Sequence, residues 1–256
     1  AGAAVAVLGG LIGLGGAEFR LPLLIAVFAV FPHRAIRINL LISLATLAIS
    51  AVVRLGVLQS TNVAAFTTDI LGMMLGGIIA AWIGAGLLAR IPKERIVVVI
   101  AALLLATAAL LAAEAFLPGT AWTALAPDSA LRVPLAILAG LLVGAISSLL
   151  GVAGGEFIIP ILILIFGADI RTAGTASVLI SIPIVLTGVA RHALTGHYRS
   201  PSMFQNLILP MVLGSIVGAV IGGYLAALAP TDALRVVLAA ILALSAVKLW
   251  TKGNAD

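Results

Sequence analysis

Two Gly-rich runs carry the residues whose types and spacing suggest chemistry. The first, from Gly13 to Pro22, reads GLGGAEFRLP, and the second, from Gly151 to Pro160, reads GVAGGEFIIP. A helix that begins after such a break presents unpaired N–H groups and the positive end of its dipole, and both favour an anion. A carboxyl group beside it is costly to bury when ionised, so it readily takes up a proton. The runs therefore predict anion binding, with proton coupling as an associated function.

Three ionisable side chains lie in these runs. Glu18 and Glu156 occupy equivalent positions and are the candidates for proton coupling, although each could instead cap the start of its own helix. Arg20 has no equivalent, because Ile158 stands at the matching position. Two roles are open for Arg20: it binds the substrate anion, or it pairs with Glu18.

The other candidates for substrate binding are polar positions on the helix that follows each break. Serine and threonine also hold membrane helices together through hydrogen bonds, which is the alternative role for them. Arg54 and the pair Arg191-His192 close these helices, where they attract anions or extend toward the membrane surface. The full set of substrate-binding candidates is Gly15, Gly16, Ala17, Glu18, Arg20, Asn39, Ser43, Gly154, Gly155, Glu156, Thr175, Ser177 and Ser181.

The composition places these residues in a membrane. Hydrophobic residues make up 63% of the chain and charged residues only 9%, with a mean hydropathy of +1.31. A soluble domain is roughly half apolar and a quarter charged, so a soluble fold is excluded. The net charge of +5 comes from basic residues scattered between apolar runs, which is typical of membrane loops and not of nucleic-acid binding. The chain has no cysteine, and its sequence predicts no metal site and no cofactor.

The sequence contains a duplication. A constant shift of 138 residues aligns the Gly-rich runs and also places Phe28 on Phe166, Gly76 on Gly214 and Pro92 on Pro230. We interpret residues 1–114 as the first membrane repeat, 115–133 as an exposed linker, and 134–256 as the second repeat. Isolated glycines such as Gly76 and Gly84 are assigned to close helix packing.

Each repeat holds four apolar stretches. The first stretch of each repeat is interrupted by the Gly-rich run, which leaves arms of about a dozen residues, or roughly 18 Å of helix. Such an arm reaches only partway across a membrane, so the stretch is either a broken spanning helix or a re-entrant hairpin. Pro22 and Pro160 are predicted in the first turn of the second arm. The stretches are 1–31, 35–56, 70–89 and 94–114, then 134–166, 173–194, 207–229 and 232–250.

Loop charges favour the hairpin. If the first stretches span, the loops on the two sides carry seven and six basic residues, which gives no bias. If they are re-entrant, four basic residues (54, 132, 171 and 235) face one side and nine face the other: Arg34, Arg37, Arg90, Lys93, Arg95, Arg191, Arg199, Lys248 and Lys252.

The predicted fold class is therefore an all-α integral membrane protein of two inverted repeats, each a re-entrant helical hairpin plus three transmembrane helices. Both termini are expected in the cytoplasm. Proteins of this architecture bind their substrate near the midplane, at the interface of the repeats.

The paired Gly-rich motifs, each followed by proline and an apolar arm, resemble the sulfite exporter TauE/SafE family of bacterial and archaeal membrane proteins. Here Ala17 ends the first copy of the three-glycine run, and Ala153 begins the second. The resemblance covers nearly the whole chain. It implies a multi-pass permease of the cytoplasmic membrane that exports sulfite or small organosulfonates.

Two other functions are weighed against a carrier. An anion channel would share the architecture, and uphill flux would distinguish the two because a channel cannot concentrate its ion. An intramembrane enzyme is disfavoured because the sequence has no His-Glu-x-x-His and no Gly-x-Ser-x-Gly motif. The expected partners are a small anion and the lipid bilayer, with a homodimer as a further candidate and no nucleic acid.

Overall fold

The computed structural model describes residues 17–26, 28–57, 62–87, 92, 98, 102, 125–126, 128–196 and 208–228. Four helices in these ranges are long and apolar enough to cross a membrane: Pro32–Arg54, Val63–Leu87, Arg132–Leu149 and Arg171–Leu194. The prediction of an all-helical, multi-pass membrane protein is confirmed at this level. The elements in chain order are α2 (Ala17–Ala26), α3 (Pro32–Val57), η1 (Val63–Phe66), α4 (Thr67–Leu87), α6 (Arg132–Leu150), α7 (Gly155–Leu164), α8 (Ile170–Leu194) and α10 (Leu209–Leu228).

Polar and apolar side chains are distributed as a lipid environment requires. Leu71 on α4, Leu138 on α6 and Leu213 on α10 are each more than half exposed. Arg20 and Asn39, by contrast, are fully buried. Large apolar side chains on the outside and polar ones inside are what a bilayer favours, because its core offers no water to polar groups.

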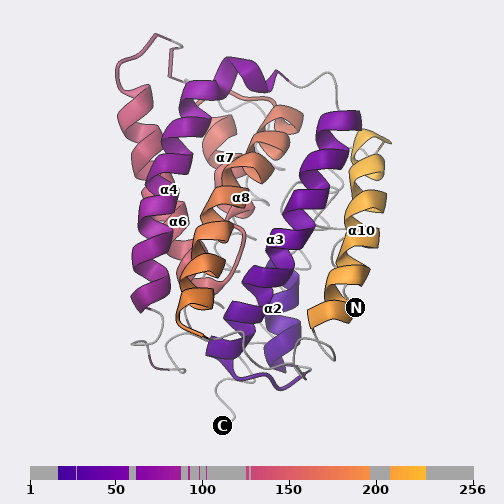
Figure 1. Cartoon of the computed structure of the whole chain (residues 1–256). Coiled ribbons are helices and arrows are strands. Elements are labelled where there is room, and N and C mark those ends of the chain that lie inside the picture. The colour runs from indigo at the N-terminus through magenta and orange to yellow at the C-terminus, as the bar shows by residue number, and fades with distance from the viewer. Residues whose placement is uncertain are drawn as a thin grey trace.

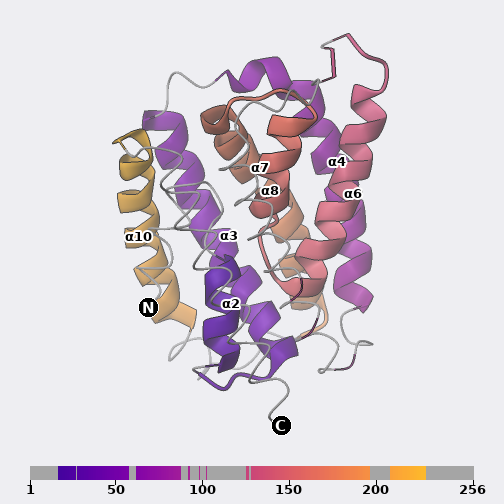
Figure 2. The same cartoon turned by 180° about the vertical axis from the view of Figure 1, so that it is seen from behind.

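The helices that the repeat pairs with one another run in opposite directions. Figures 1 and 2 show α3 and α10 rising along the long axis of the molecule, while α4, α6 and α8 descend. The short helices α2 and α7 start near the middle, and α2 runs toward one end while α7 runs toward the other. The shift of 138 residues pairs α2 with α7, α3 with α8, and α4 with α10.

Helices α4 and α6 lie side by side at very short range because glycines face each other along their contact. A Cβ atom at Gly76 would collide with the Ile137 backbone, and one at Gly84 would collide with the Ser148 hydroxyl. On the other helix, a Cβ atom at Gly144 would meet the backbone of Gly77. The packing role predicted for Gly76 and Gly84 is confirmed, and it attaches a helix of the first repeat to the hairpin of the second.

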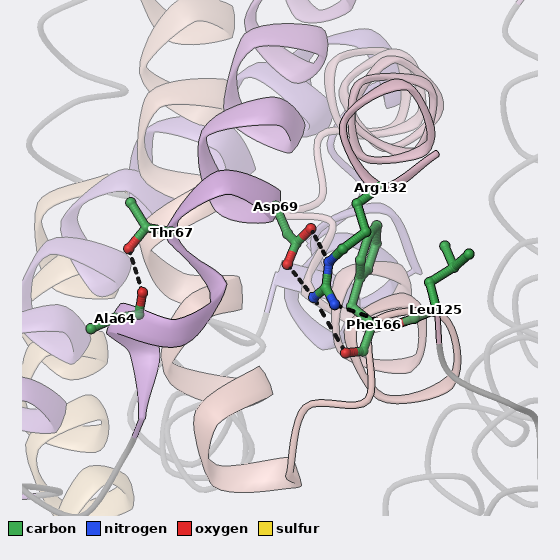
Figure 3. Close-up of polar contacts among 6 residues, drawn as sticks. All are labelled: Ala64, Thr67, Asp69, Leu125, Arg132 and Phe166. Atoms are coloured by element: carbon green, nitrogen blue, oxygen red, sulfur yellow. Dashed lines mark hydrogen bonds and ion pairs between the residues drawn. The ribbon is translucent and has the colours of Figure 1, made fainter. Parts of the chain in front are cut away.

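The two ends of the α6–α7 hairpin lie together at one end of the molecule. Arg132, at the start of α6, donates hydrogen bonds to both carboxylate oxygens of Asp69, at 3.0 and 2.5 Å. The same guanidinium donates to the carbonyls of Leu125 at 3.2 Å and of Phe166 at 3.4 Å (Figure 3). Phe166 lies two residues beyond α7, and its ring stacks below the guanidinium at 5.3 Å. The chain therefore enters and leaves this hairpin on the same side.

Two predictions about the hairpins are wrong in detail. Helix α6 has 19 residues, not about a dozen, and is long enough to cross a membrane, whereas α7 has 10. Pro160 lies inside α7, not in its first turn, because the helix resumes directly after the glycines at Gly155. Pro22 likewise lies well inside α2. Pro160 has no backbone N–H to donate to the carbonyl four residues earlier. The Glu156 carbonyl therefore lacks its intrahelical donor.

The predicted first arm before residue 17 lies outside the described residues. The stretch 232–250 lies outside them too, as does 94–114 except for two single positions.

Candidate functional site

The second Gly-rich break is a buried, irregular turn between α6 and α7. Gly151 ends α6 with φ +68°, and Gly154 precedes α7 with φ +80°. Both angles lie in the left-handed region that glycine adopts at no steric cost. The Ser147 hydroxyl donates to the Val152 carbonyl at 2.6 Å and so satisfies part of the broken backbone. Such a break is tolerated at membrane depth because protein surrounds it.

Arg20 lies in the first turn of α2, fully buried, and reaches two other helices. Its Nε donates to Asn39 Oδ1 at 3.1 Å, and its Nη2 donates to Ser43 Oγ at 2.7 Å. Its Nη1 donates to Thr46 Oγ1 and to Ser215 Oγ, each at 3.1 Å. These four acceptors are neutral oxygens, and together they orient the guanidinium.

Asn39 joins the Arg20 cluster to a described residue of each Gly-rich run. While its Oδ1 accepts from Arg20, its Nδ2 donates to the carbonyls of Ala17 and Gly151, each at 2.8 Å. Ala17 begins α2, and Gly151 ends α6 at the other break. One amide therefore holds the start of α2 and the end of α6 at one point, although Gly151 lies 112 residues after Asn39 in the sequence.

The polar candidates of the second repeat lie elsewhere. Thr175 Oγ1 donates to the Arg171 carbonyl at 3.0 Å, and Ser177 Oγ donates to the Gly174 carbonyl at 2.9 Å, both within α8. Ser181 Oγ is buried and makes no hydrogen bond within the described part of the chain. Ile158, the equivalent of Arg20, is fully buried among apolar side chains. Hydrogen bonds thus join Ala17, Arg20, Asn39 and Ser43 to one cluster, whereas the hydroxyls of Thr175 and Ser177 donate to carbonyls of α8 itself.

Several predicted site residues fall outside what the structure describes. Gly15 and Gly16 precede the described residues, and the side chains of Glu18 and Glu156 are not among those described. The backbone of Gly154 and Gly155 is described and buried. The role of the two glutamates in proton coupling, and the choice between substrate and Glu18 as a partner of Arg20, therefore remain predictions.

Two members of the cluster, Thr46 and Ser215, were not predicted from the sequence. Thr46 lies seven residues after Asn39, which is two helical turns, so it belongs to the same face as Asn39 and Ser43. This spacing could have predicted Thr46 as a member of the cluster. No sequence pattern predicts Ser215, because its position depends on how α10 packs beside α3.

The described helices and this cluster define a class: a multi-pass membrane protein with a buried, fixed cation where the start of α2 meets the break after α6, as membrane transport proteins have. The family model described as sulfite exporter TauE/SafE matches residues 1–249, and the chain belongs to that family. Membership implies a membrane transporter of the sulfite or anion type, which is consistent with a protein that is not an enzyme. No curated protein and no solved structure matches the chain.

Proposed function

We propose that this protein is a permease of the cytoplasmic membrane that exports a small oxyanion, such as sulfite or an organosulfonate, and that Arg20 is the centre of its binding site. The observation that carries the proposal is the Arg20 cluster. A fully buried guanidinium is positioned by hydroxyl and amide oxygens of α3 and α10, and Asn39 connects it to Ala17 and Gly151, one residue from each Gly-rich run.

The chemistry of the cluster suits an oxyanion. A guanidinium presents a planar fork of donors that matches two oxygens of a sulfite or sulfonate group. The starts of α2 and α7 add free N–H groups and the positive ends of two short dipoles. In a low-dielectric interior these contributions are stronger than at a surface, and they reinforce each other because all have the same sign.

The proposed topology is a pair of inverted repeats with both termini in the cytoplasm. It is supported by the opposite directions of the repeat-paired helices and by the shared end of the α6–α7 hairpin. It is supported also by charge. Arg34 begins α3 at the end of the molecule where Arg191 ends α8, which we assign to the cytoplasm, while Arg54 and Arg132 lie at the opposite end.

The direct test is sulfite flux in proteoliposomes. Arg20→Gln should lower the flux by at least about a hundredfold, since both the charge and the bidentate fork are lost. Arg20→Lys keeps the charge but not the fork, and should retain a small part of the flux. Arg34→Gln, on an exposed arginine of α3, is the matched control and should behave as wild type.

Binding in detergent completes this test, since it is independent of flux. Sulfite should raise the melting temperature of the wild type and of Arg34→Gln but not of Arg20→Gln. Wild-type flux of sulfite against its gradient would identify a carrier and exclude a channel. Undiminished flux in a folded Arg20→Gln protein would overturn the assignment of the site.

We propose further that Glu18 and Glu156 couple transport to protons. Both precede a proline by four residues on a short helix that starts at membrane depth. The double variant Glu18→Gln/Glu156→Gln should lose the response of flux to an imposed pH gradient while still exchanging anions. If the double variant responds to the gradient as the wild type does, the glutamates act as helix caps instead.

A further inference from the structure

Helix α3 carries a buried polar stripe that extends well beyond the Arg20 cluster. The stripe consists of Asn39, Ser43, Thr46, Ser50 and Arg54, at intervals of four, three, four and four residues. These intervals keep all five on one face of an α-helix. Each is no more than 2% exposed, although the other residues of α3 after Arg37 are apolar. A continuous line of buried polar groups inside a membrane helix is costly and marks a functional path.

The first three members of the stripe bind Arg20, and the last two lie beyond its reach. Ser50 is one turn past Thr46, and Arg54 is in the last turn of α3, so the stripe continues for eight residues, or about 12 Å of helix. Ser50 Oγ is buried and makes no hydrogen bond within the described residues. A buried hydroxyl is nearly always paired, so this one is available to a ligand or to water. Arg54 places a second buried cation at the end of the same stripe.

The corresponding face of α8 does not form such a path. The shift of 138 residues places Ile184 on Thr46 and Gly188 on Ser50. Ile184 is buried in the apolar core, and Gly188 faces the side chain of Leu40, which lies 3.5 Å from where a Cβ would be. The other three equivalents, Ser177, Ser181 and His192, are also polar and buried. The polar line is therefore continuous along α3, whereas on α8 Ile184 and Gly188 interrupt it.

We propose that Ser50 and Arg54 form a second anion-binding station, through which the oxyanion passes between Arg20 and the end of the molecule at which α3 ends. This inference rests on the proposed function and deepens it. The Arg54 guanidinium would bind two oxygens of the anion and the Ser50 hydroxyl would donate to a third. In the proposed topology the station lies on the outer side, so it draws the anion outward from Arg20. The inside-negative membrane potential favours the same direction.

Flux measurements separate this station from the Arg20 site. Arg54→Gln should lower sulfite or methanesulfonate flux about tenfold, as expected for the loss of one charge-assisted contact. The thermal stabilisation by the anion should persist, because Arg20 is intact. Arg54→Lys, which keeps the charge, should recover part of the flux. Arg171→Gln removes an exposed arginine at the same end of the molecule and serves as the matched control, with unchanged flux.

A single cysteine tests access to Ser50 directly, because the chain has no native cysteine. Ser50→Cys should react with a sulfonate-bearing methanethiosulfonate reagent faster than with its quaternary-ammonium analogue. Methanesulfonate should slow the reaction; sulfite is unsuitable as a protectant because it attacks such reagents. Leu47→Cys, on a fully buried apolar position of the same helix, is the control and should not react.

The outcomes distinguish the two proposals. If the wild type moves and binds no sulfite, sulfate or sulfonate, the proposed function itself fails. If the wild type transports but Arg54→Gln transports equally well, or Ser50→Cys resists the anionic reagent as Leu47→Cys does, the second station is overturned while the Arg20 site stands. Reduced flux together with anion-protected labelling of Ser50→Cys supports the station.

Discussion

The two repeats differ most clearly at positions that the duplication makes equivalent and that lie around Arg20. In the first half Arg20 meets Thr46, whereas in the second half Ile158 and Ile184 occupy the same two positions. Charged and polar side chains thus occur together in one half, and apolar side chains occur together in the other. Such paired exchange is expected where two positions are close in space, because a lone buried arginine or a lone buried threonine would be costly.

The duplication of the helices therefore does not imply a duplicated anion-binding site. Both halves contain a Gly-rich run that is followed by a short helix, α2 or α7. Among the described residues, the first half adds Arg20 and an uninterrupted polar stripe, while the α8 face of the second half is interrupted by Ile184 and by Leu40 against Gly188. We infer that the first half binds the anion, and that the second half lines the opposite side of the anion site and contributes the positive end of the α7 dipole.

The largest stability effect is expected at the shared scaffold, with Gly154→Val. A branched side chain at φ +80° costs about 1–2 kcal/mol in backbone strain. Its Cβ would also lie 2.6 Å from Val143 Cγ1, and overpacking adds roughly 1–3 kcal/mol. We expect a large fall in melting temperature in detergent and little folded protein.

Gly56→Ala is the control for Gly154→Val, since a Cβ there meets nothing within 4 Å. It should leave the melting temperature nearly unchanged. Equal melting temperatures for the two variants would show that the second break tolerates side chains, contrary to its geometry.

A smaller but more specific effect is expected from the equivalent pair Asn39→Ala and Ser177→Ala. Removing Asn39 leaves Arg20 and the carbonyls of Ala17 and Gly151 short of a partner, at a cost of about 1–3 kcal/mol for an unsatisfied buried group. Ser177 Oγ donates to the Gly174 carbonyl of its own helix, which is a contact between neutral groups, so Ser177→Ala should cost less than Asn39→Ala. Thermal unfolding checks the difference, and sulfite flux should fall only in Asn39→Ala. Equal losses in both would mean that the halves contribute alike.

The smallest effect is expected at Asp169, which caps α8, whereas the equivalent position before α3 is Phe31. Burial tends to raise the pKa of Asp169, but hydrogen bonds from Thr172 and from the Arg171 N–H outweigh it and lower the pKa below its usual value. A depressed pKa contributes stability above the unfolded pKa, and this stability is lost as the pH falls through the folded pKa.

Asp169→Ala should therefore cost about 1 kcal/mol near neutral pH and almost nothing in strong acid. Asp169→Asn, which keeps a capping side chain, should be nearly neutral at both. Melting temperatures across a pH series check this, and a cost for Asp169→Ala that does not depend on pH would contradict it.

The sequence predicted much of this molecule because the membrane constrains it so strongly. Composition and apolar length were enough for the helical, multi-pass class, and the constant shift exposed the repeat. Within the site, Arg20, Asn39 and Ser43 were predicted from the motif and from repeat-related polar positions, and the structure joins all three. Thr46 was within reach of the same helical spacing.

Tertiary structure alone decided the rest. Ser215 comes to Arg20 only because α10 packs beside α3, and no local pattern encodes a contact 195 residues away. The contacts of Asn39 were not predictable either, because its amide donates to the carbonyls of Ala17 and Gly151, which only the packing of the helices brings together. The length of α6 and the place of Pro160 depended on where the left-handed glycines end one helix and start the next, which is set by backbone geometry and not by hydrophobicity. Hydrophobic patterning thus determined what lies in the membrane, while packing determined which polar groups meet there.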